Sequence, residues 1–144
     1  MAEPIAPQPG QGSPSGPLLA CVFGYADLAT TRHALAQQAA AAGLAGQRLD
    51  DFVLAVNEIL TNAVRHAGGS GRLRLWAVGA RLLCEVTDSG RGIPPGLADI
   101  EPPPITLAPG GRGLWIARQL CDELTVVTGT GGTSVRLAVS LNAH

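Results

Sequence analysis

The sequence contains no lysine, and this absence removes several classes of enzyme from consideration. All ten basic residues of the 144-residue chain are arginines. A P-loop nucleotide site needs a lysine that reaches the phosphates, and protein kinases of the eukaryotic type need one on their third strand. Schiff-base catalysis also requires a lysine amine. The sequence therefore excludes all three kinds of chemistry.

Cysteine, net charge and long apolar runs are also scarce. The three cysteines, Cys21, Cys84 and Cys121, are far apart and lie in apolar stretches, which favours buried structural thiols over disulfides or a metal site. A net charge of -1 argues against a nucleic-acid surface. No apolar run approaches the roughly 20 residues of a membrane span, and the N-terminus lacks the pattern of a signal peptide. We therefore expect a cytoplasmic protein that binds neither nucleic acid nor membrane.

Proline is confined to two stretches: five prolines lie within residues 4–17 and six within residues 94–109. The first stretch has almost no large apolar side chains and cannot bury enough surface to offset the entropy of ordering. We therefore expect residues 1–17 to be a disordered tail. The second belongs to a loop at about 93–110, whose length is typical of a functional lid. The remainder, residues 18–144, is expected to be one domain.

Hydrophobic periodicity predicts five strands and three helices in this domain. The strands are expected at 18–24, 72–78, 81–88, 123–128 and 133–141, and the helices at about 28–42, 47–67 and 111–121. The expected strands form antiparallel pairs, and the three expected helices are enough to cover only one face of the resulting sheet. The fold class is therefore α+β: a two-layer α/β sandwich whose mixed, mostly antiparallel sheet carries helices on one face.

The helix at 47–67 carries a polar stripe beside its apolar face. Glu58, Asn62 and His66 follow one another at steps of four, which places them along one line of the helix surface, and Arg65 lies beside them. A solvated helix face and a functional row of side chains both fit this pattern, so the helix alone leaves the choice open.

Asp88 ends the strand at 81–88 in phase with the residues expected to be buried. A carboxylate on the core side of a strand is costly unless something donates hydrogen bonds to it. The sequence therefore predicts a donor from the protein or from a ligand. An alternative is an aspartate that accepts hydrogen bonds from turn amides before Gly90.

Neither the tryptophans nor the histidine of the first helix indicates a ligand site. Trp76 and Trp115 are expected to pack or to face a partner, because an indole contributes chiefly apolar area. His33 has no acidic neighbour of the kind found beside a phospho-acceptor histidine. We expect it to be a surface residue.

Four motifs occur in a fixed order within residues 18–141, and together they resemble a known superfamily. They are Glu58-x-x-x-Asn62-Ala63-x-x-His66, Asp88-x-Gly90-x-Gly92, Gly111-Arg112-Gly113-Leu114 and Gly132-Thr133. This order is similar to that of the GHKL ATPases, the superfamily of gyrase, chaperones and histidine kinases with the Bergerat nucleotide fold. The first motif most resembles the bacterial anti-sigma-factor serine/threonine kinases.

The resemblance implies roles for the polar stripe. Asn62 would be a Mg²⁺ ligand, because a neutral oxygen suits a hard cation that phosphates already bind. Glu58 would be the catalytic general base for the hydroxyl of a protein serine or of water. His66 and Arg65 would line the phosphates, although a surface salt bridge of Arg65 remains an equal alternative.

The second and fourth motifs would bind the adenine. The resemblance implies that Asp88 accepts a hydrogen bond from the exocyclic amine of the base. Thr133 would reach adenine through a water molecule, with a packed strand threonine as the alternative. Gly90 and Gly92 would leave room for the base and give the lid a hinge.

The third motif would bind the phosphates of ATP. Gly111 and Gly113 would offer backbone N–H groups at the start of a helix, which is a ready anion site. Arg112 could add the positive charge that no lysine supplies here. Leu114 completes the motif and is included among the nucleotide-binding residues on resemblance alone.

Two functions follow from the resemblance. The first is an ATP- and Mg²⁺-dependent protein serine/threonine kinase and anti-sigma factor, with a sigma factor and a STAS-type antagonist protein as partners, and assembly as a homodimer is expected of the family. The alternative is a nucleotide-dependent binding module with little or no kinase activity. The presence of Glu58 favours the kinase, whereas the stiff, apolar Pro102-Pro103-Pro104 run favours the alternative. A sensor histidine kinase fragment is disfavoured, because the sequence shows no acceptor helix pair.

Overall fold

A computed structural model describes residues 16–66, 70–88, 111–129 and 132–141. Its elements in chain order are β1 (Leu19–Gly24), the 3₁₀ helix η1 (Tyr25–Asp27), α2 (Leu28–Ala41), α3 (Gly46–His66), β2 (Ser70–Val78), β3 (Arg81–Asp88), α4 (Gly111–Leu120), β4 (Glu123–Gly129) and β5 (Gly132–Ser140). Each expected strand and helix is present, close to its expected bounds. The expected lid at 93–110 and residues 1–15 of the expected tail lie outside the described residues.

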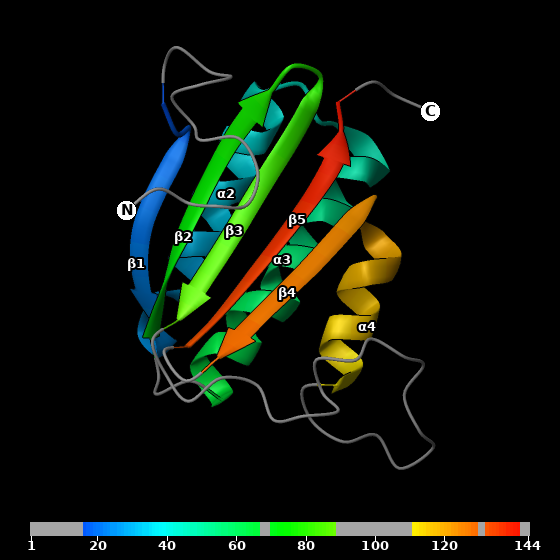
Figure 1. Cartoon of the computed structure of the whole chain (residues 1–144). Coiled ribbons are helices and arrows are strands. Elements are labelled where there is room, and N and C mark those ends of the chain that lie inside the picture. The colour runs from blue at the N-terminus through cyan, green and yellow to red at the C-terminus, as the bar shows by residue number, and fades with distance from the viewer. Residues whose placement is uncertain (1–15, 67–69, 89–110, 130–131, 142–144) are drawn as a thin grey trace.

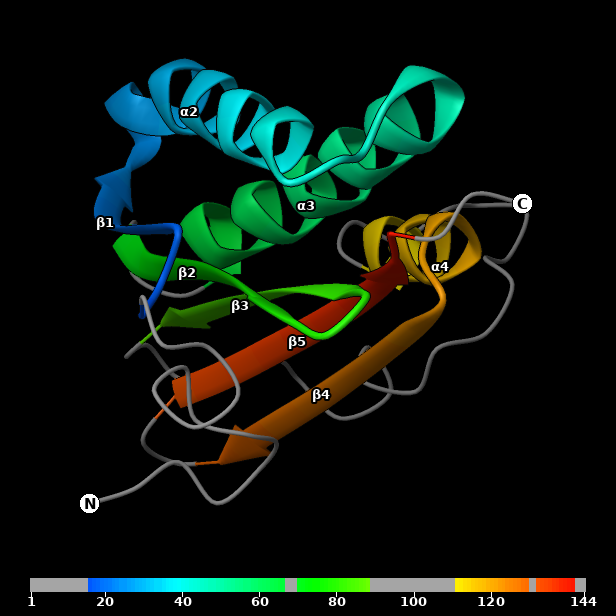
Figure 2. The same cartoon turned by 90° about the horizontal axis from the view of Figure 1, so that it is seen from above.

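The strands form one sheet in the order β1-β2-β3-β5-β4 (Figure 1). All four pairings within this sheet are antiparallel. Figure 2 shows the three helices together on one side of the sheet. The expected two-layer α+β fold is therefore confirmed, and the described strands form a wholly antiparallel sheet where a mixed one was expected.

The core lies between the sheet and the helices. Helix α3 supplies its centre, because Phe52, Val56 and Leu60 recur at helical spacing and each is fully buried. They face a layer of strand residues that includes Leu73 and Leu75 of β2, which are also fully buried. Burial of each such side chain contributes about 1.5–3 kcal/mol, so this layer holds the helices on the sheet.

In the described part of the chain, no helix combines the length and the apolar character that crossing a bilayer requires.

Helix α2 begins and ends where the sequence indicates. Asp27 is the residue before the helix, and its side chain caps the preceding η1, because its Oδ2 accepts a hydrogen bond from the N–H of Gly24 at 2.9 Å. Gly43 follows the helix with φ +119°, a conformation that favours glycine. The N–H of Leu44 then donates to the carbonyl of Ala39 at 3.1 Å, which closes the helix and turns the chain toward α3.

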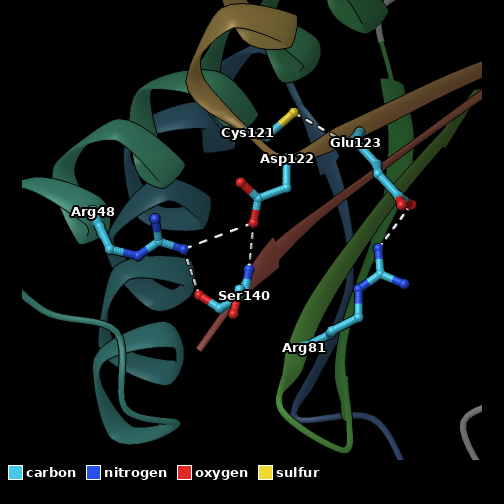
Figure 3. Close-up of polar contacts among 6 residues, drawn as sticks. All are labelled: Arg48, Arg81, Cys121, Asp122, Glu123 and Ser140. Atoms are coloured by element: carbon cyan, nitrogen blue, oxygen red, sulfur yellow. Dashed lines mark hydrogen bonds and ion pairs between the residues drawn. The ribbon is translucent and has the colours of Figure 1, made fainter. Parts of the chain in front are cut away.

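Polar contacts fasten the start of α3 to the sheet (Figure 3). Arg48 donates to the carbonyl of Ser140 and forms an ion pair with Asp122 at 3.8 Å. The N–H of Ser140 donates to Asp122 Oδ2 at 2.7 Å, and Arg81 pairs with Glu123 at 2.7 Å. Exposed pairs of this kind contribute roughly 0–1 kcal/mol each. They fix the relative positions of α3, β4 and β5 at the end of the sheet where β5 finishes.

The face of the sheet opposite the described helices, called the helix-free face below, carries a charged cluster. Glu85 is 5% exposed and accepts hydrogen bonds from Arg74 at 2.6 Å and from Arg136 at 2.7 Å. Both guanidinium groups lie over the ring of Trp76, at 5.4 and 5.1 Å from its centroid. Trp76 therefore packs within the protein, as the sequence predicted for the tryptophans.

Candidate functional site

The residues of the four motifs that the structure describes converge on one end of the sheet. In Figure 1 the last turn of α3, the first turn of α4, the end of β3 and the start of β5 lie at the same end of the molecule. Antiparallel pairing of β3 with β5 brings the second and fourth motifs together, because it places Asp88 directly opposite Thr133. Packing of α4 against α3 brings the first and third motifs together.

Gly113 lies where the first turn of α4 contacts α3. A Cβ atom at this position would lie 3.0 Å from Oε1 of Glu58 and 3.5 Å from Oδ1 of Asn62. A separation of 3.0 Å is tighter than most Cβ contacts, so a larger residue would displace the Glu58 side chain. The absence of a side chain at Gly113 thus lets the first turn of α4 rest directly against the polar stripe of α3.

The polar stripe is not a uniformly solvated helix face. Asn62 is only 7% exposed, Glu58 is partly exposed, and Arg65 is exposed. His66 ends α3, and its side chain lies outside the described part. The burial of Asn62 beside Gly113 leaves a neutral amide and a carboxylate side by side at the junction of two helices.

The first turn of α4 is the part of the structure on which the expected phosphate site depends. The first N–H groups of a helix have no partner within it, and the helix dipole makes this end positive. No acidic residue occurs in the first turn of α4, so no side chain there competes with a bound anion. Gly111 and Arg112 open the helix, although the Arg112 side chain is outside the described part. Leu114 is 1% exposed and belongs to the hydrophobic core, so it anchors this turn.

Asp88 is buried at the end of β3 and has a hydrogen-bond donor from the protein. It is 8% exposed, and its Oδ1 accepts the backbone N–H of Thr133 at 3.3 Å. Thr133 is itself 3% exposed, on the core-facing side of β5. The pair forms a buried acceptor and a hydroxyl next to each other. Gly90 and Gly92, and hence the alternative of turn amides, lie outside the described residues.

The donor set fits Mg²⁺·ATP better than a metal held by protein alone. Among the described residues there is no group of three or more histidine, cysteine, aspartate or glutamate side chains that could hold a metal ion. Mg²⁺ commonly takes one or two protein oxygens together with phosphates and waters. Asn62, beside Gly113 in the first turn of α4, carries an oxygen of this kind.

The cysteines contribute no nucleophile. The three thiols are free, and Cys84 is buried. Burial raises the pKa of Cys84 far above its usual value and, helped by the charge of Asp122, raises the pKa of Cys121 to about 11. Burial also raises the pKa of Cys21. All three are therefore protonated at neutral pH, which agrees with the structural role expected for them.

One supporting contact was not foreseen from the sequence. Arg32 of α2 donates to Oδ1 of Asn57 at 3.0 Å, and Asn57 immediately precedes Glu58. The two residues are 25 positions apart on different helices, so no local pattern signals the contact. It ties α2 to the turn of α3 that presents Glu58. His33, one position along α2, is exposed as expected.

Comparison with known proteins identifies a family and several solved structures of similar fold. The model of the histidine kinase-like ATPase domain matches residues 24–139. The RsbU and RsbW domains of Rv1364c from Mycobacterium tuberculosis align over 85% of this chain and 32% of that chain, with 21% identity and a TM-score of 0.61. The mycobacterial sensor histidine kinase MprB aligns over 85% of this chain and 97% of that one, with 18% identity and a TM-score of 0.55.

A third solved structure has higher sequence identity over a shorter stretch. The blue-light activated histidine kinase of Erythrobacter litoralis is 33% identical over 66% of this chain and 31% of its own, with a TM-score of 0.51. The chain thus spans about a third of that kinase and of the Mycobacterium tuberculosis protein. A comparison with curated proteins finds no match.

Proposed function

Because the chain belongs to the histidine kinase-like ATPase domain family, we propose that it binds Mg²⁺·ATP at the end of the sheet marked by Asp88 and Asn62. We propose further that it is a protein serine/threonine kinase and anti-sigma factor that acts in a partner-switching system. The observation that carries the proposal is the contact of Gly113 with Glu58 and Asn62 at the start of α4.

Adenine binding is supported by the Asp88 and Thr133 pair. A buried carboxylate oxygen is a strong acceptor for an exocyclic amine, because the bond is charge-assisted and shielded from water. Thr133 adds a hydroxyl within the same buried region, and its N–H already orients Asp88. Gly90 and Gly92 would flank the base. This pair would distinguish adenine, which carries an amine, from a base that presents a carbonyl at the same place.

Phosphate binding is supported by the first turn of α4 and by the end of α3. The N–H groups of Gly111 and Gly113 would bind phosphate oxygens at the positive end of the helix. Asn62 would supply the protein oxygen for Mg²⁺, whose chemistry here is to neutralise the phosphates. Arg65 and Arg112 could add positive charge at the same end, in place of a lysine.

Phosphoryl transfer needs a group that accepts a proton, and we assign this role to Glu58. The carboxylate of Glu58 would take the proton of a serine hydroxyl as the hydroxyl oxygen bonds to the γ-phosphorus and the bond to the β-phosphate oxygen breaks. Its Oε1 lies 3.0 Å from the position that a Cβ atom at Gly113 would take, so the proposed base would be adjacent to the proposed phosphate site. A pure binding module would have no use for a carboxylate there.

Serine specificity and the partners rest on the motif resemblance. The form of Glu58-x-x-x-Asn62 is similar to that of the anti-sigma-factor kinases, which act on a STAS-type antagonist and hold a sigma factor. We propose the same two partners and a homodimer for this chain. The alternative, a nucleotide-dependent binding module, is the outcome expected if ATP binds without turnover.

The proposal is tested by phosphorylation of partner proteins. Wild-type protein and Glu58→Gln are incubated with γ-labelled ATP, Mg²⁺ and purified STAS-type proteins from the same genome. We expect the wild type to form an acid-stable, alkali-labile phosphoprotein, as phosphoserine is, and Glu58→Gln to bind ATP without forming it. An acid-labile product would contradict serine specificity and favour histidine transfer. ATP binding with no transfer to any candidate would favour the binding module.

A further inference from the structure

The helix-free face, opposite the described helices, contains a row of buried apolar residues. In register, Trp76 of β2 lies opposite Leu83 of β3, which lies opposite Ala138 of β5. They are 0%, 5% and 2% exposed and form a cluster of their own, with Val78 packed against it. Figure 2 shows the helices of the described part on the other side of the sheet. These helices therefore do not account for the burial of this row.

Trp76 has an unpartnered donor at the centre of this row. Its indole Nε1 is buried and has no hydrogen-bond acceptor among the described residues. Arg74 and Arg136 lie over the ring, while the carboxylate of Glu85 accepts hydrogen bonds from both arginines. A buried N–H without an acceptor is strongly unfavourable, and buried tryptophans usually have one. The site therefore requires an acceptor that approaches the edge of the indole.

The described chain begins beside this row. The N–H of Leu18 donates to the carbonyl of Leu75 at 2.7 Å, and the register of β1 with β2 brings Leu18 level with Trp76. Fifteen residues precede the described part of the chain. Three neighbouring strands span only about 10 Å, whereas fifteen extended residues reach about 50 Å. Residues 1–15 are therefore long enough to cross the whole row from the point where they join residue 16.

The chemistry of the segment matches the row. Pro4-Ile5-Ala6-Pro7 is a P-x-x-P sequence. Such segments favour the polyproline II conformation, in which no carbonyl is used in internal hydrogen bonds, and they dock on aromatic surfaces. Glu3 precedes the motif, and the cluster of two arginines and one glutamate that it would meet has a positive balance.

We propose that residues 1–15 dock on the helix-free face of their own chain in the polyproline II conformation, with a backbone carbonyl of the Pro4–Pro7 motif accepting the Trp76 indole N–H. The composition of this segment predicts disorder when it is considered alone. The entropic cost of ordering the segment is small, because proline has already lost most of its backbone freedom. The hydrogen bond that the Trp76 indole gains then offsets this cost. The segment is then an intramolecular ligand of the sheet, on the face opposite the helices.

The test uses the full-length chain and the exchange of the Trp76 indole hydrogen with water, followed by nuclear magnetic resonance. Trp115→Phe serves as the background that assigns the signal. The test variant is Pro4→Gly/Pro7→Gly, and the matched control is Pro102→Gly/Pro104→Gly, the same change in the second proline stretch. None of these proline positions belongs to the described core, so folding is not at risk.

We expect slow indole exchange in the parent and control chains and about tenfold faster exchange in Pro4→Gly/Pro7→Gly, the effect of losing one hydrogen bond. The protection should not change on dilution, because the ligand is part of the same chain. Equal exchange in all three chains would overturn the proposal. Protection that falls on dilution would also overturn it, since a second copy of the chain would then be the occupant.

Discussion

Strand β3 carries two buried carboxylates that the fold treats differently. Glu85 is 5% exposed on the helix-free face, and Asp88 is 8% exposed three residues later, at the end of the strand. Glu85 accepts hydrogen bonds from two arginines at 2.6 and 2.7 Å, whereas Asp88 accepts a backbone N–H at 3.3 Å. Two charged donors thus hold the Glu85 carboxylate, while a backbone N–H is one of the donors to Asp88 at the edge of the proposed site. Burial alone does not identify a functional carboxylate, because the identity of its donors matters as well.

The first way to sharpen this comparison is to remove the carboxylate of Glu85. Glu85→Ala removes the carboxylate that pairs with buried Arg136, and we expect the free energy of unfolding to fall by about 3 kcal/mol, as for other broken buried pairs. Denaturant unfolding measures the change. The control is Glu123→Ala, which removes an exposed partner of Arg81 at a similar distance of 2.7 Å and should cost roughly 0–1 kcal/mol. Equal losses would show that the buried cluster is no more stabilising than a surface pair.

The pH dependence of stability should report the same cluster. Burial by itself would raise the pKa of Glu85, but the hydrogen bonds and charges of Arg74 and Arg136 outweigh it and lower that pKa. A pKa that is lower in the folded state stabilises the fold above the ordinary value of about 4.3, and this contribution is lost as pH falls through the folded pKa. We expect Glu85→Gln to flatten the acid limb of stability against pH. An acid limb as steep as that of the wild type would assign it to other carboxylates.

A change at Gly113 should affect turnover more than folding. The Cβ of Gly113→Ala would lie 3.0 Å from Oε1 of Glu58, so the flexible carboxylate must move away from its position. We expect the rate of phosphoryl transfer to fall by about tenfold, because a displaced base loses its alignment. Stability should change by less than about 1 kcal/mol, since alanine also favours the helix. Parallel kinetics and thermal unfolding separate these effects, and an unchanged rate would remove Glu58 from the proposed role of base.

The smallest effect is expected for the stability of Asp88→Asn. The asparagine keeps an oxygen that can accept the N–H of Thr133. The substitution also removes the buried negative charge of Asp88, which is costly to bury. We expect the free energy of unfolding to change by less than about 1 kcal/mol, in contrast to Glu85→Ala. Denaturant unfolding of the two variants side by side measures the contrast. A loss as large as that of Glu85→Ala would make Asp88 a structural carboxylate too.

The sequence predicts the fold because its local patterns are strong. Helical spacing of Phe52, Val56 and Leu60 sets the buried face of α3, and strand alternation places Asp88 in phase with the core. The pairing of Asp88 with Thr133 follows once β3 and β5 are neighbours. The resemblance of the four motifs also implies that Asp88 and the α3 stripe lie at one site. The role of this site in binding ATP stays a prediction.

Contacts between distant residues could not be predicted in the same way. Alternation along β3 assigns Glu85 to the second face but cannot reveal that this face is also buried. The arginine partners of Glu85 are 11 and 51 positions away, so only the folded sheet brings Arg74 and Arg136 together. The role of Gly113 likewise becomes visible only once α4 packs on α3, because a glycine in such a motif can equally serve a turn or a helix end. Each of these features depends on tertiary packing, which leaves no local pattern.

The most direct test of the central claim is calorimetric titration of Mg²⁺·ATP into the wild type, Asp88→Asn and Glu85→Gln at one pH. We predict that the wild type binds, that Asp88→Asn binds about 10- to 100-fold more weakly because a charge-assisted acceptor is lost, and that folded Glu85→Gln binds as tightly as the wild type. Equal affinity of Asp88→Asn and the wild type, or no binding by the wild type, would contradict the claim that Asp88 marks the nucleotide site.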